Sequence, residues 1–113
     1  MRLENKVAIV TGGAQGLGEA YSLGMAREGA SVVIADIDEI SGNKVEEQIR
    51  KSGGKALFVR TDVSRKADTK AMVQRAVREF GRLDVIVNNA GILFSAPVED
   101  TTEEMWDKQF AVN

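Results

Sequence analysis

TGGAQGLG, residues 11–18, follows the apolar run VAIV at residues 7–10 and leads into a segment with a helical pattern. Glycines at positions 12, 16 and 18 allow the backbone to pass close to a ligand, and the first N–H groups of the following helix then face that ligand. The spacing differs from the common G-x-G-x-x-G arrangement, and Gly13 adds a further glycine. The stretch therefore predicts a phosphate-binding turn between a strand and a helix.

The rest of the chain continues the alternation of short apolar runs and helical patterns. Strands are expected at residues 7–10, 31–35, 56–59 and 85–87, each apolar on both faces, as strands covered by helices on both sides should be. This order predicts an α/β fold with a parallel sheet, in a single domain over residues 1–113.

The helices expected between these strands have recognisable ends. The first begins at the glycine turn, with Leu17, Ala20 and Gly24 predicted to face the sheet, and ends at Gly29. The second opens near Asp38, which is expected to cap it, and ends at the glycines at 53 and 54. Its buried positions are expected to be Val45 and Ile49.

Two further helices follow. Ser64 is the expected cap of the third, whose apolar positions Val73, Ala76, Val77 and Phe80 recur at helical spacing. The fourth begins at the capping box of residues 101–104, and the sequence ends at position 113 within its pattern. We therefore expect a chain truncated in its fourth helix.

The composition disfavours several classes of function. The formal net charge is -2 with Lys and Arg scattered among Asp and Glu, which disfavours nucleic acid and membrane surfaces as partners. The sequence has no Cys and no His, which disfavours metal sites and Ser-His catalysis. No apolar stretch resembles a signal peptide or a membrane span, so a cytoplasmic location is expected.

Asp36 ends the second predicted strand, where a dinucleotide-binding fold presents a carboxylate to the adenosine ribose. Its two oxygens can accept from both ribose hydroxyls, whereas a 2′-phosphate would meet like charge. Neither Gln15 nor Ile37 offers a cation to such a phosphate. The pattern predicts NAD rather than NADP; the alternative is that Asp36 only caps the next helix, a role we assign to Asp38.

Polar and small residues also follow the third and fourth predicted strands. Asp62 and Val63 could pair with an adenine edge, although an Asp before Ser64 is equally typical of a simple turn. In the segment Asn88-Asn89-Ala90-Gly91, small residues permit close approach of a ligand, and an amide side chain can bridge strands. A plain turn is the alternative there, and both roles are compatible.

The chain resembles the N-terminal half of a short-chain dehydrogenase/reductase with subunits of the roughly 250-residue type. The resemblance rests on TGGAQGLG, Asp36, Asp62-Val63, NNAG and the closing FAVN. The resemblance covers the whole chain. It implies a Rossmann-type doubly wound sheet with strand order 3-2-1-4. A further strand beside the fourth would lie beyond this sequence, so residues 85–87 are expected on an open edge.

The resemblance also implies roles for particular residues. The cofactor loop would contain Gly12, Gly16 and Gly18, with the backbone of Leu17 near the pyrophosphate. Asp36 would select NAD, Asn89 would stabilise the central sheet, and the remaining cofactor contacts would come from Asp62, Val63, Ala90 and Gly91. Asn113 corresponds to the asparagine of the catalytic tetrad, whose backbone carbonyl holds a water that relays protons.

In the family, the other tetrad members, a Ser and a Tyr-x-x-x-Lys pair, lie in the second half of the subunit, which this sequence does not include. Tyr21, the single tyrosine of the sequence, is followed four residues later by Met25 instead of Lys. We expect the complete protein to be an NAD-dependent oxidoreductase, a homo-oligomeric dimer or tetramer acting on a small alcohol or ketone. The 113-residue chain alone is expected to be inactive. The alternative is a non-catalytic nucleotide-binding or partner-binding half-domain. An S-adenosylmethionine methyltransferase is disfavoured by the Thr-Gly start and the NNAG segment.

Overall fold

The computed structural model describes residues 2–89 and 92–95. Each predicted strand is present and differs from its expected bounds by no more than one residue at either end. The elements are β1 (Val7–Thr11), α1 (Gly16–Arg27), β2 (Ser31–Asp36), α2 (Glu39–Lys51), β3 (Lys55–Arg60), α3 (Lys66–Phe80), β4 (Val85–Asn88) and β5 (Ile92–Ser95).

The strands form one sheet in the order β3-β2-β1-β4-β5. The first four are parallel, in the predicted order 3-2-1-4. The expectation of an open edge at residues 85–87 is wrong, because β5 pairs with β4 there in antiparallel register, from Val85 opposite Ser95 to Asn88 opposite Ile92. A short connection can reverse the chain into an antiparallel neighbour, whereas a parallel neighbour needs a longer crossover.

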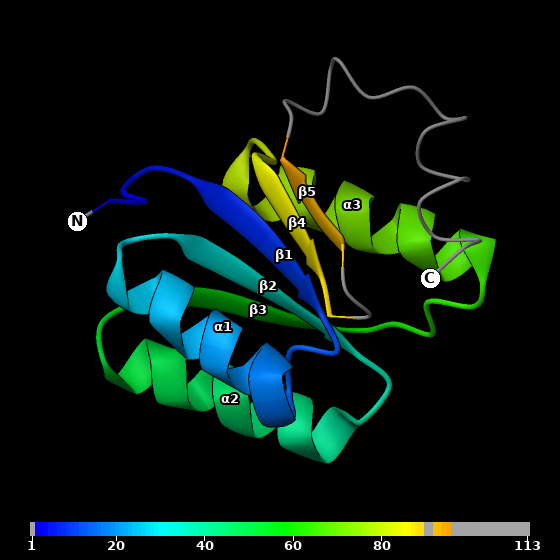
Figure 1. Ribbon diagram of the computed structural model, residues 1–113, viewed down its shortest axis with the longest axis horizontal. Helices are drawn as coiled ribbons and strands as arrows, with labels where there is room; N and C mark the ends of the chain where they lie inside the picture. Colours follow the sequence, from blue (N-terminus) through cyan, green and yellow to red (C-terminus); the bar gives the residue numbers. More distant parts are fainter. Residues whose placement is uncertain (1, 90–91, 96–113) are drawn as a thin grey trace.

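Helices cover both faces of the parallel strands, with α1 and α2 on one side and α3 on the other (Figure 1). Alternate residues along each strand enter different cores. Ile9 and Val33 pack with Met72 of α3, whereas Val10 and Ile34 belong to the core formed with α1 and α2. Burial of each such side chain contributes about 1.5–3 kcal/mol. The two-sided apolar character predicted from the sequence is confirmed.

The predicted sheet-facing side of α1 is wrong. Leu17 is 67% exposed and Ala20 is also exposed, while Gly18 and Ser22 are buried. The cause is a close backbone contact, since a Cβ on Gly18 would lie 1.8 Å from the carbonyl oxygen of Gly12. Gly18 therefore faces the turn, and Ser22, one helical turn later, lies on the same side.

The start of α2 is as predicted, because the Asp38 carboxylate accepts from the Ser41 N–H at 3.1 Å. Val45 and Ile49 are buried, also as predicted. The start of α3 differs from the prediction. Its N-cap position is Arg65 and not Ser64.

The buried face of α3 also differs in part from the prediction. It contains Met72 and Ala76, while Val77 is 38% exposed. The fourth predicted helix lies outside the described residues.

Candidate functional site

The carboxyl ends of the four parallel strands meet at one edge of the sheet, and the glycine turn after β1 lies at this edge (Figure 1). At the same edge β2 ends at Asp36, and β4 ends at Asn88, which Asn89 follows. In open parallel sheets, ligands bind in the crevice outside these strand ends. The topology therefore brings the predicted site segments to the edge where a ligand would bind.

The glycines of the turn have distinct physical roles. Gly12 and Gly16 have φ values of 62° and 56°, a left-handed conformation that other residues adopt only with strain. A Cβ on Gly16 would have no atom within 4 Å, so the space beside it is open. At Gly18, in contrast, the neighbouring Gly12 carbonyl fills the position of a Cβ. The turn thus leaves room at Gly16 and packs tightly at Gly18.

Ser22 of α1 connects the helix to the glycine turn by hydrogen bonds. Its hydroxyl is fully buried and lies 3.0 Å from the Gly13 carbonyl oxygen and 2.9 Å from that of Gly18, so it can donate to either. Sequence reasoning missed this role. The available signal was the serine one helical turn after Gly18, which is not among the residues predicted to face the sheet.

Asp36 joins the end of β2 to the glycine turn. Its Oδ2 accepts from the Ala14 N–H at 3.1 Å, and its Oδ1 accepts from the Asp38 N–H at 3.0 Å. Asp36 is only 9% exposed. A carboxylate has about four acceptor positions, so these two bonds leave capacity for a ligand.

Gln15 lies in the glycine turn, Leu17 lies in the first turn of α1, and Ile37 directly follows Asp36. The Gln15 amide nitrogen donates to Asp38 Oδ2 at 2.8 Å and lies 3.3 Å from the Ser41 hydroxyl. Leu17 is 67% exposed and Ile37 is 55% exposed. Exposed apolar side chains at these two positions would suit the apolar parts of a ligand.

Asp62 and Val63 follow β3 at the same edge. Asp62 Oδ1 accepts from the N–H of Ser64 at 3.0 Å and from its hydroxyl at 2.6 Å. The Ser64 hydroxyl and N–H hold the pKa of Asp62 below its usual range. The turn geometry offered as an alternative in the sequence analysis is therefore present, and Val63 is half-buried beside it.

Thr11 ties the glycine turn to the end of β4. Its hydroxyl donates to the Val87 carbonyl at 3.2 Å and accepts from the Asn89 N–H at 3.2 Å. Asn88 is 7% exposed and its Oδ1 lies 3.5 Å from the Thr11 hydroxyl, whereas Asn89 is exposed. The Asn89 amide lies against the turn, 3.1 Å from where a Cβ of Gly12 would be. Sequence analysis missed the bridging role of Thr11.

Three predicted site residues, Ala90, Gly91 and Asn113, lie outside the described residues. Within the described ranges, no cluster of three or more His, Cys, Asp or Glu residues could hold a metal ion. In the same part of the chain, no helix is long and apolar enough to cross a membrane.

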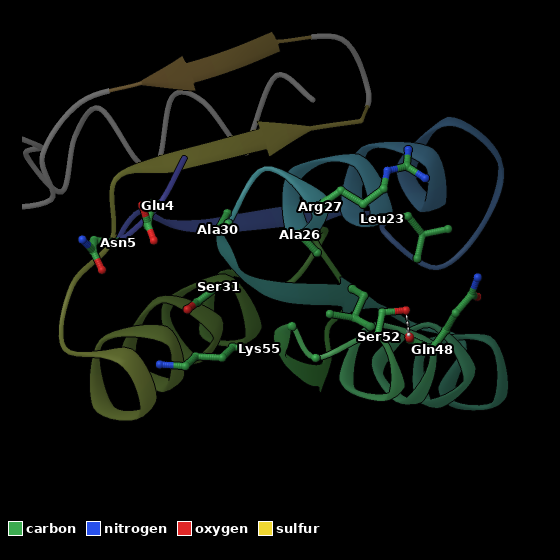
Figure 2. Close-up of a pocket in the computed structure, with 14 residues that line it drawn as sticks. Glu4, Asn5, Leu23, Ala26, Arg27, Ala30, Ser31, Gln48, Ser52 and Lys55 are labelled. Atoms are coloured by element: carbon green, nitrogen blue, oxygen red, sulfur yellow. Dashed lines mark hydrogen bonds between the residues drawn. The ribbon is translucent and has the colours of Figure 1, made fainter. Parts of the chain in front are cut away.

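A cavity of about 540 Å³ lies at the opposite edge of the sheet (Figure 2). It lies between the C-terminal ends of α1 and α2, where β2 and β3 begin, and its lining includes Arg27, Ser31, Gln48 and Lys55. It contains none of the predicted site residues. We therefore assign the site by the glycine turn and Asp36 rather than by this cavity.

A family model described as short chain dehydrogenase matches residues 6–113. The chain is 44% identical to a cyclopentanol dehydrogenase of Comamonas sp., over 99% of this chain and 45% of the relative. It is 45% identical to a 2,5-dichloro-2,5-cyclohexadiene-1,4-diol dehydrogenase of Sphingobium indicum, over 99% of this chain and 45% of the relative. The chain thus spans less than half the length of these relatives.

A solved hydroxysteroid dehydrogenase from Escherichia coli has a similar structure, with a TM-score of 0.77 and 37% identity, over 80% of this chain and 39% of that one. A glucose dehydrogenase from Caenorhabditis elegans gives a TM-score of 0.75 and 34% identity, over 79% of this chain and 39% of that one.

Proposed function

The chain belongs to the short-chain dehydrogenase/reductase family, and from this membership we propose that it forms the cofactor-binding part of an NAD-dependent oxidoreductase. The observation that carries the proposal is the pairing of two features at one edge of the sheet. Open space lies beside Gly16 at the N-terminus of α1, and the Asp36 carboxylate is bonded to the same turn. The first feature suits a pyrophosphate and the second suits a ribose diol.

The residues present fit such a group. The N-terminal turn of α1 directs N–H groups without intrahelical partners toward the open space, and the helix dipole favours an anion there. Gly16 keeps a side chain out of that space, and Leu17, the next residue of α1, would contribute a backbone N–H beside it. Asp36 would accept from the ribose hydroxyls through the acceptor positions that Ala14 and Asp38 leave open.

When bound, the nicotinamide would accept or donate a hydride, and this chain's residues would hold and orient the cofactor. The loop after β3, with Asp62 and Val63, would meet the adenine. Asn89, Ala90 and Gly91 would line the cofactor cleft, and the backbone carbonyl of Asn113 would hold a water on the proton path.

We further propose a small alcohol or ketone as substrate. The names of two relatives support this proposal, since each denotes a dehydrogenase of a cyclic alcohol or diol. Residues 1–113 would act as one NAD-binding unit of a cytoplasmic homo-oligomer, a dimer or tetramer.

The test is turnover by the purified protein that carries this sequence. Secondary alcohols, cyclopentanol among them, are offered with NAD and separately with NADP, and reduced cofactor is measured spectrophotometrically. The proposal expects NAD reduction with at least one alcohol. Binding of NAD without turnover of any alcohol or ketone would favour the alternative, a non-catalytic nucleotide-binding module. Absence of NAD binding would contradict both.

A further inference from the structure

Two loops of the site are joined by a closed set of hydrogen bonds. Asp36 accepts from the N–H groups of Ala14 and Asp38 at 3.1 and 3.0 Å. Asp38 in turn accepts from the Gln15 side chain at 2.8 Å. Because Gln15 follows Ala14 directly, these bonds form a ring, which we call the loop clasp: Ala14, Gln15, Asp36 and Asp38.

Gln15 of the clasp and Ser41 of α2 together hold the Asp38 carboxylate in one place. Its Oδ1 accepts from the Ser41 N–H at 3.1 Å, and its Oδ2 accepts from the Ser41 hydroxyl at 3.0 Å as well as from Gln15. The N–H and hydroxyl of Ser41 hold the pKa of Asp38 below its usual range. Asp38 is ionised at neutral pH, as surface carboxylates are, but these bonds also hold it in one position.

The clasp also determines what Gln15 can offer. Its amide nitrogen donates to the Asp38 carboxylate and also lies within hydrogen-bond distance of the Ser41 hydroxyl, so its donors are engaged in these bonds when a phosphate approaches the turn. A 2′-phosphate beside Asp36 would instead meet a ring that contains two carboxylates. A phosphate monoester adds about −1.5 to −2 charge at neutral pH, so each fixed carboxylate nearby repels it.

We propose that Asp38, held in position by Gln15, is a second specificity-determining carboxylate that acts with Asp36 to exclude cofactors with a 2′-phosphate. This inference rests on the proposed function, because it assumes that an adenine dinucleotide binds at the glycine turn. Gln15 is a positioning residue in this arrangement.

The experiment compares direct binding of NADH and NADPH to the purified protein that carries this sequence, measured by cofactor fluorescence. The Asp38→Asn variant loses the charge but keeps a side chain that caps helices as well as Asp does. We expect the ratio of the NADPH to the NADH dissociation constant to fall about three- to tenfold. The effect should shrink at high salt, because a charge effect between partly exposed groups is screened.

The matched control is Glu39→Gln, which removes the neighbouring exposed carboxylate, the next residue along the chain and no member of the clasp. In Glu39→Gln the ratio of the NADPH to the NADH dissociation constant should change by less than about twofold, since an exposed charge outside the clasp is screened by solvent and salt. Gln15→Ala should lower the ratio by about two- to fourfold, because it releases Asp38 without removing its charge.

The outcomes separate the two proposals. If Asp38→Asn leaves the ratio unchanged, or weakens both cofactors equally, Asp38 has only a structural role and the inference is overturned, while the proposed function stands. If the unmodified protein binds neither cofactor, the proposed function fails and the inference fails with it. A change in Glu39→Gln as large as in Asp38→Asn would also overturn the inference, because the effect would then reflect general surface charge.

Discussion

The buried carboxylate of Asp36 accepts a hydrogen bond from the backbone N–H of Ala14 at 3.1 Å, so the end of β2 holds the glycine turn that follows β1. The residue proposed to select the cofactor therefore also shapes the loop that would bind its phosphates. A substitution at Asp36 should alter both properties.

We expect Asp36→Ala to lower the free energy of unfolding by about 1–3 kcal/mol, because it leaves the N–H groups of Ala14 and Asp38 without their acceptor. Asp36→Asn should cost less, since it retains one carbonyl oxygen. Urea denaturation of the two variants measures the difference. Equal stability of Asp36→Ala and the unmodified protein would show that the bond to Ala14 contributes nothing.

Gly18→Ala should disrupt the turn, because the new Cβ would lie 1.8 Å from the Gly12 carbonyl oxygen. Overpacking of this kind costs about 1–3 kcal/mol, and a displaced turn should weaken NADH binding about tenfold or more. The matched control is Gly24→Ala in the same helix, where the nearest atom to a Cβ is the Arg27 guanidinium at 3.9 Å.

The control variant Gly24→Ala should be about 0.4–1 kcal/mol more stable than the unmodified protein, since alanine favours the helix, and its NADH binding should be unchanged. Fluorescence titration and thermal denaturation of both variants provide the measurements. Normal NADH affinity in Gly18→Ala would mean that the close contact between Gly18 and Gly12 is unimportant for the site.

Thr11→Val should destabilise the protein by about 1–3 kcal/mol. The substitution removes the buried hydroxyl that donates to the Val87 carbonyl and accepts from the Asn89 N–H, while it keeps the shape of the side chain. Thr11→Ser retains the hydroxyl and should recover most of the lost hydrogen bonding. Hydrogen exchange at the Asn89 amide tests the mechanism, which requires faster exchange in Thr11→Val than in Thr11→Ser.

Asp84 should make stability depend on acid pH. Burial by itself would raise the pKa of Asp84, but the hydrogen bonds from Arg82 and from the Val7 N–H, with the charges of Arg82 and Lys6, bring it below the ordinary 3.8. A depressed pKa in the folded state contributes stability that is present above 3.8 and lost as the pH falls through the lower folded value.

Denaturation midpoints measured between neutral pH and the acid limit check this expectation. Asp84→Asn should be less stable at neutral pH, because it loses the ion pair with Arg82. As the pH falls below the ordinary Asp range, the free energy of unfolding of this variant should decrease less than that of the unmodified protein. An identical pH dependence in both proteins would exclude Asp84 as a contributor.

The strands were predictable because local sequence controls them. Val32 and Val33 are neighbours on opposite faces of β2, and both are apolar, which is typical of a strand covered on both faces. The face of α1 was not predictable, since it depends on the contact between Gly12 and Gly18, which forms only once the turn is folded. The antiparallel β5 was not predicted, although ILFS at residues 92–95 is an apolar run after a short segment that contains Gly, and its pairing with β4 follows that local pattern.

In the candidate site, too, the features set by local sequence were predictable and those that depend on tertiary contacts were not. The position of Asp36 at a strand end follows from the strand pattern, so its place at the carboxyl edge could be predicted. Its bond to Ala14 and the bond between Gln15 and Asp38 could not, because each joins residues more than twenty positions apart. Ser22 was missed for a related reason, since its role becomes visible only when the buried side of α1 is known.

The cofactor preference is measured by titration of the purified protein with NADH and NADPH. NADH should bind at least about tenfold more tightly, a difference of about 1.4 kcal/mol, because the Asp36 carboxylate favours a ribose diol over a 2′-phosphate. Equal dissociation constants, or tighter binding of NADPH, would contradict it.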